Sequence, residues 1–281
     1  MKRVEALVSV LGLARLVSCA SVENRASDVM GTAQKVPAAP KKGTLAVLHT
    51  NDHHGHPLKF YDFPADGQGG LIPRSTYVKE VRSQFENVLL LDAGDITTGR
   101  PESMFFDAAA DIIGCNHIGY DAVAVGNHAF DKPQSVLKKQ MASTRFPFLS
   151  ANVRYADGSY FAKPHVVKTF KDFTVGVFGL TTSEINDIAG DVAMIKGLVN
   201  MGSYATDREG SRRLAAQVAG IDLIIDGHTH TEDVMASGHW DRKAPFVETN
   251  TPIVQSQQWG RKVGTPREAH SLAQPRIFVR F

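Results

Sequence analysis

Four short polar clusters carry the residues of this chain whose types and spacing could do chemistry. Each directly follows an apolar, strand-like run: Asp52-His53-His54, Gly94-Asp95, Gly126-Asn127-His128 and Gly227-His228-Thr229-His230. In an open α/β sheet, the loops after the carboxyl ends of the strands gather at one edge, where ligands bind. Carboxylates, imidazoles and an amide that meet there form a ligand set for divalent cations. Two cations that share a carboxylate would explain the number of ligands, and they indicate a hydrolase.

Spacing within the clusters predicts where the side chains point. Asp52 and His54 alternate along a segment that we expect to be extended, so both side chains point to one face. His53 then points the other way, into a packing or supporting position. His228 and His230 have the same spacing at the end of a buried strand, which predicts that their imidazoles meet in one place.

The remaining two clusters supply a carboxylate, an amide and a third imidazole. Asp95 on its own would be interpreted as a helix cap, but beside the other clusters it predicts a carboxylate that bridges two cations. Asn127 can coordinate a cation, while the adjacent His128 faces the substrate as a proton donor or stabilises charge on phosphoryl oxygens. Asp131 can accept the other ring N–H and fix the tautomer. The alternative is an Asx-turn followed by a helix cap.

Periodic patterns predict the elements that position these clusters. The expected strands cover residues 45–48, 88–91, 122–125, 147–153, 174–180, 221–225 and 253–255. The expected helices cover residues 75–85, 135–141 (capped by Ser135) and 208–218. Many strands for this length, with both parallel crossovers and hairpin-like pieces, predict two packed sheets flanked by helices.

Composition is that of a soluble globular protein, with 281 residues of which 43% are hydrophobic and 21% charged. A net charge of +2 is too small to indicate binding to a nucleic acid polymer. The absence of an apolar run of about 18 residues predicts no transmembrane span in the mature protein. Cys115 lies in a helix-like apolar pattern, which predicts a small buried core residue rather than a nucleophile.

The N-terminal segment resembles a bacterial lipoprotein signal. A basic start, Met1-Lys2-Arg3, precedes a mostly apolar stretch that ends in Leu16-Val17-Ser18-Cys19. We therefore expect residues 1–19 to be the signal and Cys19 to be acylated, in a periplasmic or membrane-anchored protein that meets the membrane only through this lipid. An ordinary cleaved signal peptide or an amphipathic helix is the alternative. Residues 20–43, rich in Ala, Ser, Pro and Lys, are expected to be a flexible tether.

Taken together, the clusters resemble the calcineurin-like metallophosphoesterases, and among them the bacterial periplasmic 5′-nucleotidase and UDP-sugar hydrolase family. The resemblance covers about Leu45 to Thr182 and resumes from about Ile221 to Gly264. Its motifs include His49-Thr50-Asn51-Asp52-His53-His54-Gly55-His56, Gly94-Asp95-Ile96-Thr97-Thr98-Gly99, Gly126-Asn127-His128-Ala129-Phe130-Asp131 and Asp226-Gly227-His228-Thr229-His230. It implies an α/β fold over residues 44–264, a sandwich of two mixed β-sheets flanked by helices.

The same resemblance implies a two-metal phosphoesterase that acts on phosphomonoesters, and most directly on 5′-nucleotides. Asp52, His54 and His230 would hold one divalent ion, Asn127 and His228 the other, and Asp95 would bridge them. The ions would be zinc, manganese or magnesium. A metal-bound hydroxide would attack phosphorus in line, with His128, oriented by Asp131, as the catalytic imidazole.

Three departures from the family pattern bear on activity. The family carries a further metal-binding His where this chain has Asn200, which predicts weaker occupancy of the second metal or a preference for Mg²⁺ or Mn²⁺. Ala129 stands where the family usually has an acidic residue. Family members also carry a C-terminal domain that stacks on the nucleotide base, whereas residues 265–281 are expected to be an atypical tail with a strand-like alternation at Arg276–Phe281.

Two other functions stay open at this point. A non-catalytic metal- or phosphate-binding lipoprotein on a degraded phosphatase scaffold is favoured by Asn200 and by the missing domain. The retained Asp52, Asp95 and His128 argue against that hypothesis. A metal-dependent amidohydrolase or deaminase would need a histidine pair at the first strand and a zinc-type Glu signature, and neither is present. The sequence does not indicate an oligomeric state.

Overall fold

The structure is a computed structural model, and it describes residues 45–62, 65–182, 192–194, 210–218, 220–230, 234–235, 251, 253–264 and 277–280. The chain divides into two compact units, Met1–Lys35 and Val36–Phe281, and every described residue belongs to the second. The predicted signal and tether, together with Asn200, lie outside the described residues and stay predictions. Within the described part of the chain, no helix is long and apolar enough to cross a membrane.

The first sheet has four parallel strands. In spatial order they are β1 (Leu45–Thr50), β4 (Asn87–Asp92), β5 (Ala122–Ala124) and β6 (Phe148–Leu149). Almost every residue of β1 and β4 is buried, as expected for parallel strands that are covered on both faces. Parallel neighbours require crossovers, and the crossover helices are α1 (Leu71–Gln84), α3 (Ala109–Ile118) and α4 (Gln134–Ser143).

The second sheet has six strands of mixed direction. Their order is β12 (Val234–Met235), β13 (Ile253–Val254), β11 (Leu223–Ile225), β14 (Ile277–Arg280), β9 (Thr174–Phe178) and β8 (His165–Thr169). The outer pairs β12–β13 and β8–β9 are antiparallel, and the inner pairs are parallel. The strand-like alternation near the end of the sequence therefore forms β14, which pairs with both β9 and β11 inside the sheet.

Several shorter elements complete the described structure. Two small antiparallel sheets pair β2 (Phe60–Asp62) with β3 (Ala65–Gln68) and β7 (Val153–Tyr155) with β10 (Val192–Met194). The remaining helices are α2 (Pro101–Met104), the 3₁₀ helix η2 (Asn127–Phe130) and α5 (Ser211–Gln217).

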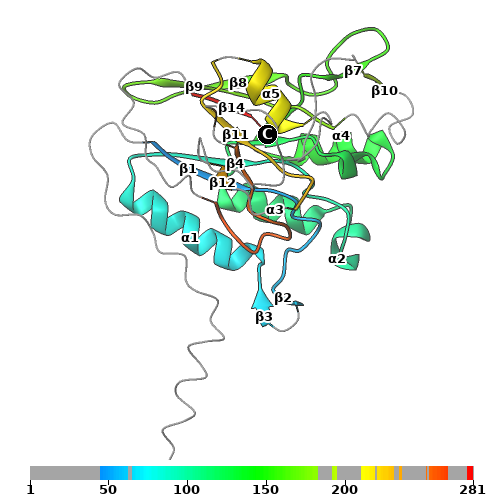
Figure 1. The fold of residues 1–281 in the computed structure, drawn as a ribbon. Helices are drawn as coiled ribbons and strands as arrows, with labels where there is room; N and C mark the ends of the chain where they lie inside the picture. Colours follow the sequence, from blue (N-terminus) through cyan, green and yellow to red (C-terminus); the bar gives the residue numbers. More distant parts are fainter. Residues whose placement is uncertain are drawn as a thin grey trace, which may run out of the picture. The chain divides into compact units, whose positions relative to one another are not determined.

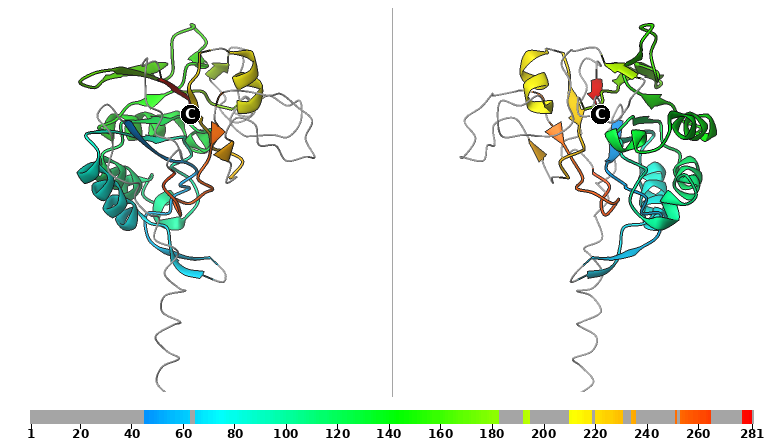
Figure 2. Two further views of the ribbon diagram at one scale, coloured as in Figure 1. Left: turned by 60° about the vertical axis from the view of Figure 1, so that its left-hand side comes forward. Right: turned by 90° about the vertical axis from the view of Figure 1, so that its right-hand side faces the viewer.

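Three apolar clusters pack these elements into four layers. One cluster joins the first sheet to α1, α3 and α4, through buried residues such as Leu48, Leu90, Val78, Cys115 and Leu137. The second joins the opposite face of that sheet to the second sheet, through residues such as Leu89, Leu91, Val175 and Ile225. The third joins the second sheet to α5, through Ile224, Ile253 and Leu214. Figure 1 shows α5 above the sheets and α1 and α3 below them, and the right-hand view of Figure 2 shows α5 on one side and the cyan and green helices of the first sheet on the other. The predicted sandwich is confirmed.

Element boundaries differ from the sequence-based expectations in ways that the contacts explain. Helix α1 begins at Leu71 rather than Ser75, because Arg74 is buried and extends the inward face by one turn. Ser135 does not cap α4, which follows Pro133 and has no side-chain cap bond. The strand expected over residues 147–153 is two short strands in different sheets. Between them, Ser150 and Asn152 bond to Thr181 and interrupt the pairing. Cys115 is a buried core residue, as predicted.

Candidate metal centre

The polar clusters follow β1, β4, β5 and β11, and most of their predicted ligands lie in sharp turns. Asp52, His54, Asp95, His228 and His230 have φ between 47° and 68°, in the left-handed region. Residues other than glycine adopt this conformation at a cost of roughly 1–3 kcal/mol, and such residues gather at functional sites. The extended segment predicted for Asp52 and His54 is therefore wrong, although their side chains still converge.

Backbone hydrogen bonds between the clusters hold these turns. The N–H of Asp52 donates to the Gly94 carbonyl at 3.0 Å, and the N–H of His54 donates to the Asp95 carbonyl at 2.9 Å. The N–H of Trp259 donates to the Asp52 carbonyl at 2.6 Å. These bonds tie together loops that are far apart in the sequence, so each turn is supported by partners in another loop.

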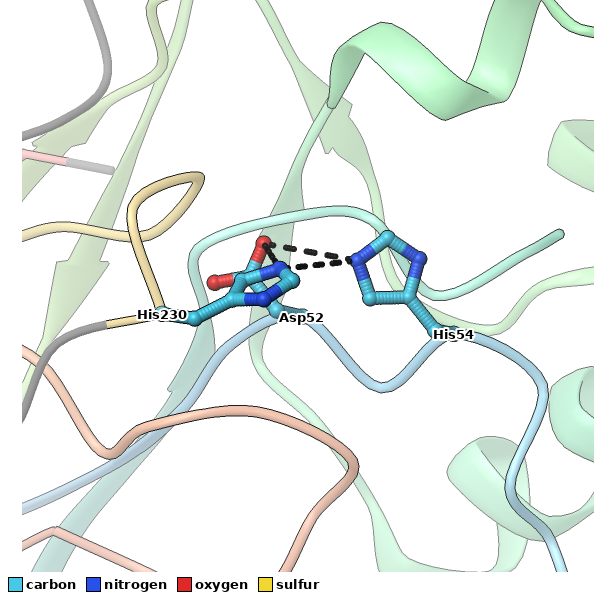
Figure 3. Close-up of side chains that lie close together, drawn as sticks. All are labelled: Asp52, His54 and His230. Carbon is cyan, nitrogen blue, oxygen red and sulfur yellow. Dashed lines mark hydrogen bonds and ion pairs between the residues drawn. The ribbon is translucent and has the colours of Figure 1, made fainter. Parts of the chain in front are cut away.

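Asp52, His54 and His230 form the first group of ligand atoms (Figure 3). The Nε2 atoms of His54 and His230 are 3.1 Å apart, and Asp52 Oδ1 lies 3.6 Å from His230 Nε2 and 3.9 Å from His54 Nε2. Nδ1 of His54 lies 3.1 Å from the Thr98 carbonyl, an acceptor, so Nδ1 carries the hydrogen and Nε2 presents a lone pair. Ring nitrogens and a carboxylate that face one another in this way fit a divalent cation of the zinc or manganese type.

Asp95 forms a second group of ligand atoms together with His54 and His128. Its carboxylate is buried and accepts the backbone N–H of His128 at 2.9 Å. Burial, followed by the negative charge of Asp52, raises the pKa of Asp95 to about 7. A divalent cation bound beside Asp95 would favour the charged form of this carboxylate, so its surroundings suit a cation.

His228 lies in a different place from His230. Its Nδ1 is 3.0 Å from the side-chain oxygen of Asn127, whereas the ring of His230 lies against His54. The two rings therefore contact different partners, and the prediction that they meet in one place stays a prediction. The pairing of His228 with Asn127 agrees with the division of ligands that the family resemblance implies. Asn200 lies outside the described residues, so its place near this pair is not described.

His128 lies at the open side of the centre. Its Nδ1 is 2.8 Å from Asp131 Oδ2, and its side chain is 40% exposed. Partial burial opposes the charged ring, but the carboxylates of Asp95 and Asp131 outweigh it and raise the pKa of His128. The ring lies edge-on to that of His54, with 4.9 Å between centroids. This arrangement lets the other ring nitrogen meet a substrate next to the first group of ligands.

Two supporting residues, Asn51 and Arg74, contact the Asp52–His54 turn and were not identified from the sequence. Asn51 donates to Asp52 Oδ2 at 2.6 Å and accepts the N–H of Ser256 at 2.7 Å, so it fixes the carboxylate against a distant loop. Arg74 contacts Nδ1 of His53 at 3.0 Å. Arg74 had a visible signal, because it lies four residues before Val78 on the inward stripe of a helix. His53 is fully buried in the predicted supporting position, where burial and then the charge of Arg74 lower its pKa to about 4.

Comparisons with known proteins place this geometry in a family. The family model described as calcineurin-like phosphoesterase matches residues 45–232. Protein UshA of Salmonella pullorum is 34% identical over 284 residues, which cover 83% of this chain and 50% of that protein. A 5′-nucleotidase of Vibrio cholerae is 32% identical over 301 residues, 90% of this chain and 53% of that protein. The chain thus spans about half the length of these relatives.

A solved structure supports the same conclusion for the fold. The crystal structure of the calcineurin-like phosphoesterase YfkN from Bacillus subtilis superimposes with a TM-score of 0.64, at 23% identity, over 79% of this chain and 83% of that one. The likeness extends to the layered sheets and helices described above. Because the family model covers more than half of the sequence, including all four polar clusters, the chain belongs to the calcineurin-like phosphoesterase family.

Proposed function

We propose that the chain hydrolyses phosphomonoesters, most directly 5′-nucleotides, at a centre of two divalent ions. The observation that carries the proposal is the convergence of Asp52 Oδ1 with the Nε2 atoms of His54 and His230, all within 3.9 Å of one another. The buried Asp95 carboxylate and the His128 imidazole lie directly beside this group. Such a constellation holds cations next to a proton-transferring ring, as phosphoester hydrolysis requires.

The ions would supply an activated water molecule and neutralise charge on the phosphoryl oxygens. The residues of the chain would hold the ions and transfer the proton. Asp95 would lie between the two ions, and Asn127 with His228 would hold the second. His128 would donate a hydrogen bond or a proton toward the leaving oxygen, since its Nδ1 is already engaged by Asp131. This pairing keeps the ring oriented with one nitrogen free for the substrate.

A nucleotide is the substrate class that the relatives favour. The Vibrio cholerae relative is named a 5′-nucleotidase, and it aligns with 90% of this chain. The alignment covers only about half of that relative, so recognition of the base is a separate question from hydrolysis of the phosphate. Comparison of AMP with a small aryl phosphate separates the two.

The experiment is metal analysis combined with phosphate release from AMP and from 4-nitrophenyl phosphate, with Zn²⁺, Mn²⁺ or Mg²⁺ supplied. We expect release in at least one metal, and loss of that release in Asp95→Asn. Asp157→Asn is the matched control, because that exposed Asp accepts hydrogen bonds from its near neighbour Ser159 and is not among the residues of the centre. Release from the aryl phosphate alone would show hydrolysis without nucleotide selectivity. No release from either substrate would favour a metal- or phosphate-binding protein instead.

The second metal deserves its own comparison, since Asn200 replaces a stronger ligand of the family pattern. We propose that the second ion is held weakly, or is Mg²⁺ or Mn²⁺. An Asn200→His variant should then retain a second zinc ion that the wild type loses on dialysis. Equal zinc content in the two proteins would refute this part of the proposal.

We also propose that the chain is exported and anchored through Cys19. The support is the basic start and apolar stretch that precede this residue. Labelling of bacterial cells with a radioactive fatty acid should mark the wild type and leave Cys19→Ser unmarked. A label that survives the substitution would refute acylation at this residue.

A further inference from the structure

A chain of six buried polar side chains lies behind the ligand turns, contributed by α1, α3 and the ends of the first sheet's strands. In hydrogen-bonded order its members are Asp111, His53, Arg74, Tyr120, Thr50 and Asp92. Successive polar atoms are 2.9, 3.0, 3.1, 2.8 and 2.5 Å apart. Each residue is at most 5% exposed. We call this set the Arg74 network.

Hydrogen-bonding chemistry fixes the direction of every proton in the Arg74 network. A guanidinium has donors only, so Nδ1 of His53 accepts from Arg74, and Nε2 of His53 carries the hydrogen that Asp111 accepts. In the other direction Arg74 donates to the Tyr120 hydroxyl. That hydroxyl then donates to Thr50, and Thr50 donates to Asp92. Every hydrogen bond of the network is therefore donated in the direction away from the Arg74 guanidinium, toward Asp111 in one arm and toward Asp92 in the other.

Each arm of the Arg74 network meets one ligand turn, one through His53 and the other through Asp92. His53 is the residue between Asp52 and His54, so its ring anchors that turn from the side opposite the ligands. Asp92 accepts the N–H of Gly94 at 2.8 Å, directly before the turn of Asp95. Left-handed turns at residues other than glycine persist only where surrounding contacts hold them. Here the Arg74 guanidinium connects to both turns, through His53 on one side and through Asp92 on the other.

A third loop closes over the same guanidinium. A Cβ placed on Gly260 would lie 1.6 Å from Arg74 Nη2 and 3.3 Å from His53 Nδ1, so only glycine allows this approach. Its neighbour Trp259 donates its N–H to the Asp52 carbonyl at 2.6 Å. The Trp259–Gly260 loop therefore reaches the ligand turn and its anchor together.

We infer that Arg74 is a positioning residue of the metal centre, which holds the Asp52–His54 turn and the Asp95 turn in register from behind. The inference rests on the metal centre of the proposed function. Within the described part of the chain, Nε of Arg74 and Oδ2 of Asp111 lack hydrogen-bond partners. Buried polar atoms without partners cost free energy, so stability does not account for this network. Its geometry is instead suited to holding the two turns in place.

The test is a Co²⁺ titration of the full chain after removal of metals, with affinity and the Co²⁺ absorption spectrum as readouts. Arg74→Lys keeps the charge but offers one nitrogen in place of the two that contact His53 and Tyr120. We expect it to lower Co²⁺ affinity by roughly 10–100-fold and to change the spectrum. Tyr120→Phe removes one hydroxyl while keeping the ring that packs against Phe146, and we expect a smaller loss of affinity.

Arg82→Met is the matched control, because Arg82 lies on the same helix and bonds to the carbonyls of Ile118 and Gly119 at the end of α3. We expect it to lower the unfolding temperature of the metal-free chain and to leave Co²⁺ affinity and spectrum unchanged. Equal Co²⁺ binding by Arg74→Lys and wild type would overturn the inference, as would an equal loss in Arg82→Met. If Arg74→Lys does not fold, unchanged binding in Tyr120→Phe overturns it.

The Co²⁺ titration, compared with the phosphate-release assay, distinguishes failure of this inference from failure of the proposed function. A wild-type chain that binds Co²⁺ but releases no phosphate from AMP or 4-nitrophenyl phosphate would refute hydrolysis and leave the positioning role of Arg74 standing. A wild-type chain that binds no Co²⁺ would overturn both.

Discussion

Gly126 allows the closest approach between two of the ligand loops, so Gly126→Ala should disable the centre. Its φ is −83°, an ordinary value for any residue, so the effect is purely steric. A Cβ at this position would lie 2.1 Å from Asp95 Oδ1 and 2.4 Å from the Asp95 nitrogen. Relief to 3.0 Å requires a shift of 0.9 Å (3.0 minus 2.1) by a buried carboxylate or its backbone.

A displacement of about 1 Å typically costs 10²-fold in rate when it moves a catalytic group, and we expect a loss of that order in phosphate release. Overpacking should also destabilise the fold by about 1–3 kcal/mol. The assay is release of 4-nitrophenol from its phosphate, paired with Co²⁺ titration and with urea unfolding to correct for stability.

Gly114→Ala serves as the control for Gly126→Ala. Its added Cβ would approach Leu71 Cδ1 at 2.2 Å, a similar overlap with the tip of a flexible apolar side chain. Because Gly114 lies inside helix α3, alanine should gain up to about 1 kcal/mol of helix propensity, against any cost of moving Leu71. Unchanged hydrolysis and Co²⁺ affinity in Gly126→Ala would refute the contact between Gly126 and Asp95 as the determinant of the centre.

Three further predictions follow from the same structure. Burial lowers the pKa of His49 to about 3. The unfolded chain takes up a proton below about pH 6.5 and the folded chain does not, so the stability present above 6.5 is lost as pH falls toward 3. When the pH falls from 7.5 to 5, the free energy of unfolding of the metal-free chain, measured in urea, should therefore fall by about 2 kcal/mol less in His49→Asn than in wild type. An equal fall in the two proteins would contradict the lowered pKa of His49. Asp131→Asn should lower kcat by about 10–100-fold with KM little changed, which steady-state kinetics would check. Leu90→Ala, at a fully buried position, should lower the free energy of unfolding by about 2–5 kcal/mol in the same urea assay, and a loss under about 1 kcal/mol would contradict the packing described for the first sheet.

Parts of the fold were predictable because local pattern and tertiary environment agree. The apolar runs of β1 and β4 indicate strands that are covered on both faces, and the structure places helices on one side and the second sheet on the other. The break after β6 was not predictable. Ser150 and Asn152 leave the sheet for bonds to Thr181, a residue about 30 positions away. The position of β14 between β9 and β11 also depends on pairing that no local pattern contains.

The chemistry of the centre was more predictable than its geometry. Residue types at strand ends were enough to nominate Asp52, His54 and His230, and the structure brings them together. The backbone that does so was not predictable, since a left-handed turn at a non-glycine residue is set by partners in other loops. The buried position of Arg74 was predictable, because it lies on the inward stripe of a helix, but its partners His53 and Tyr120 were not.

The candidate metal centre costs the chain free energy in backbone conformation and in charge. Five predicted ligands have left-handed backbones, each at a cost on the order of 1 kcal/mol or more. Burial and the negative charge of Asp52 oppose the ionisation of Asp95, and the Nε2 atoms of His54 and His230 face each other at 3.1 Å. Packing elsewhere and the bonds among the turns must offset these costs before any cation arrives. The cation then meets ligands that need little rearrangement. On the proposed function, features that weaken the metal-free chain are therefore the ones that would favour binding of a divalent ion.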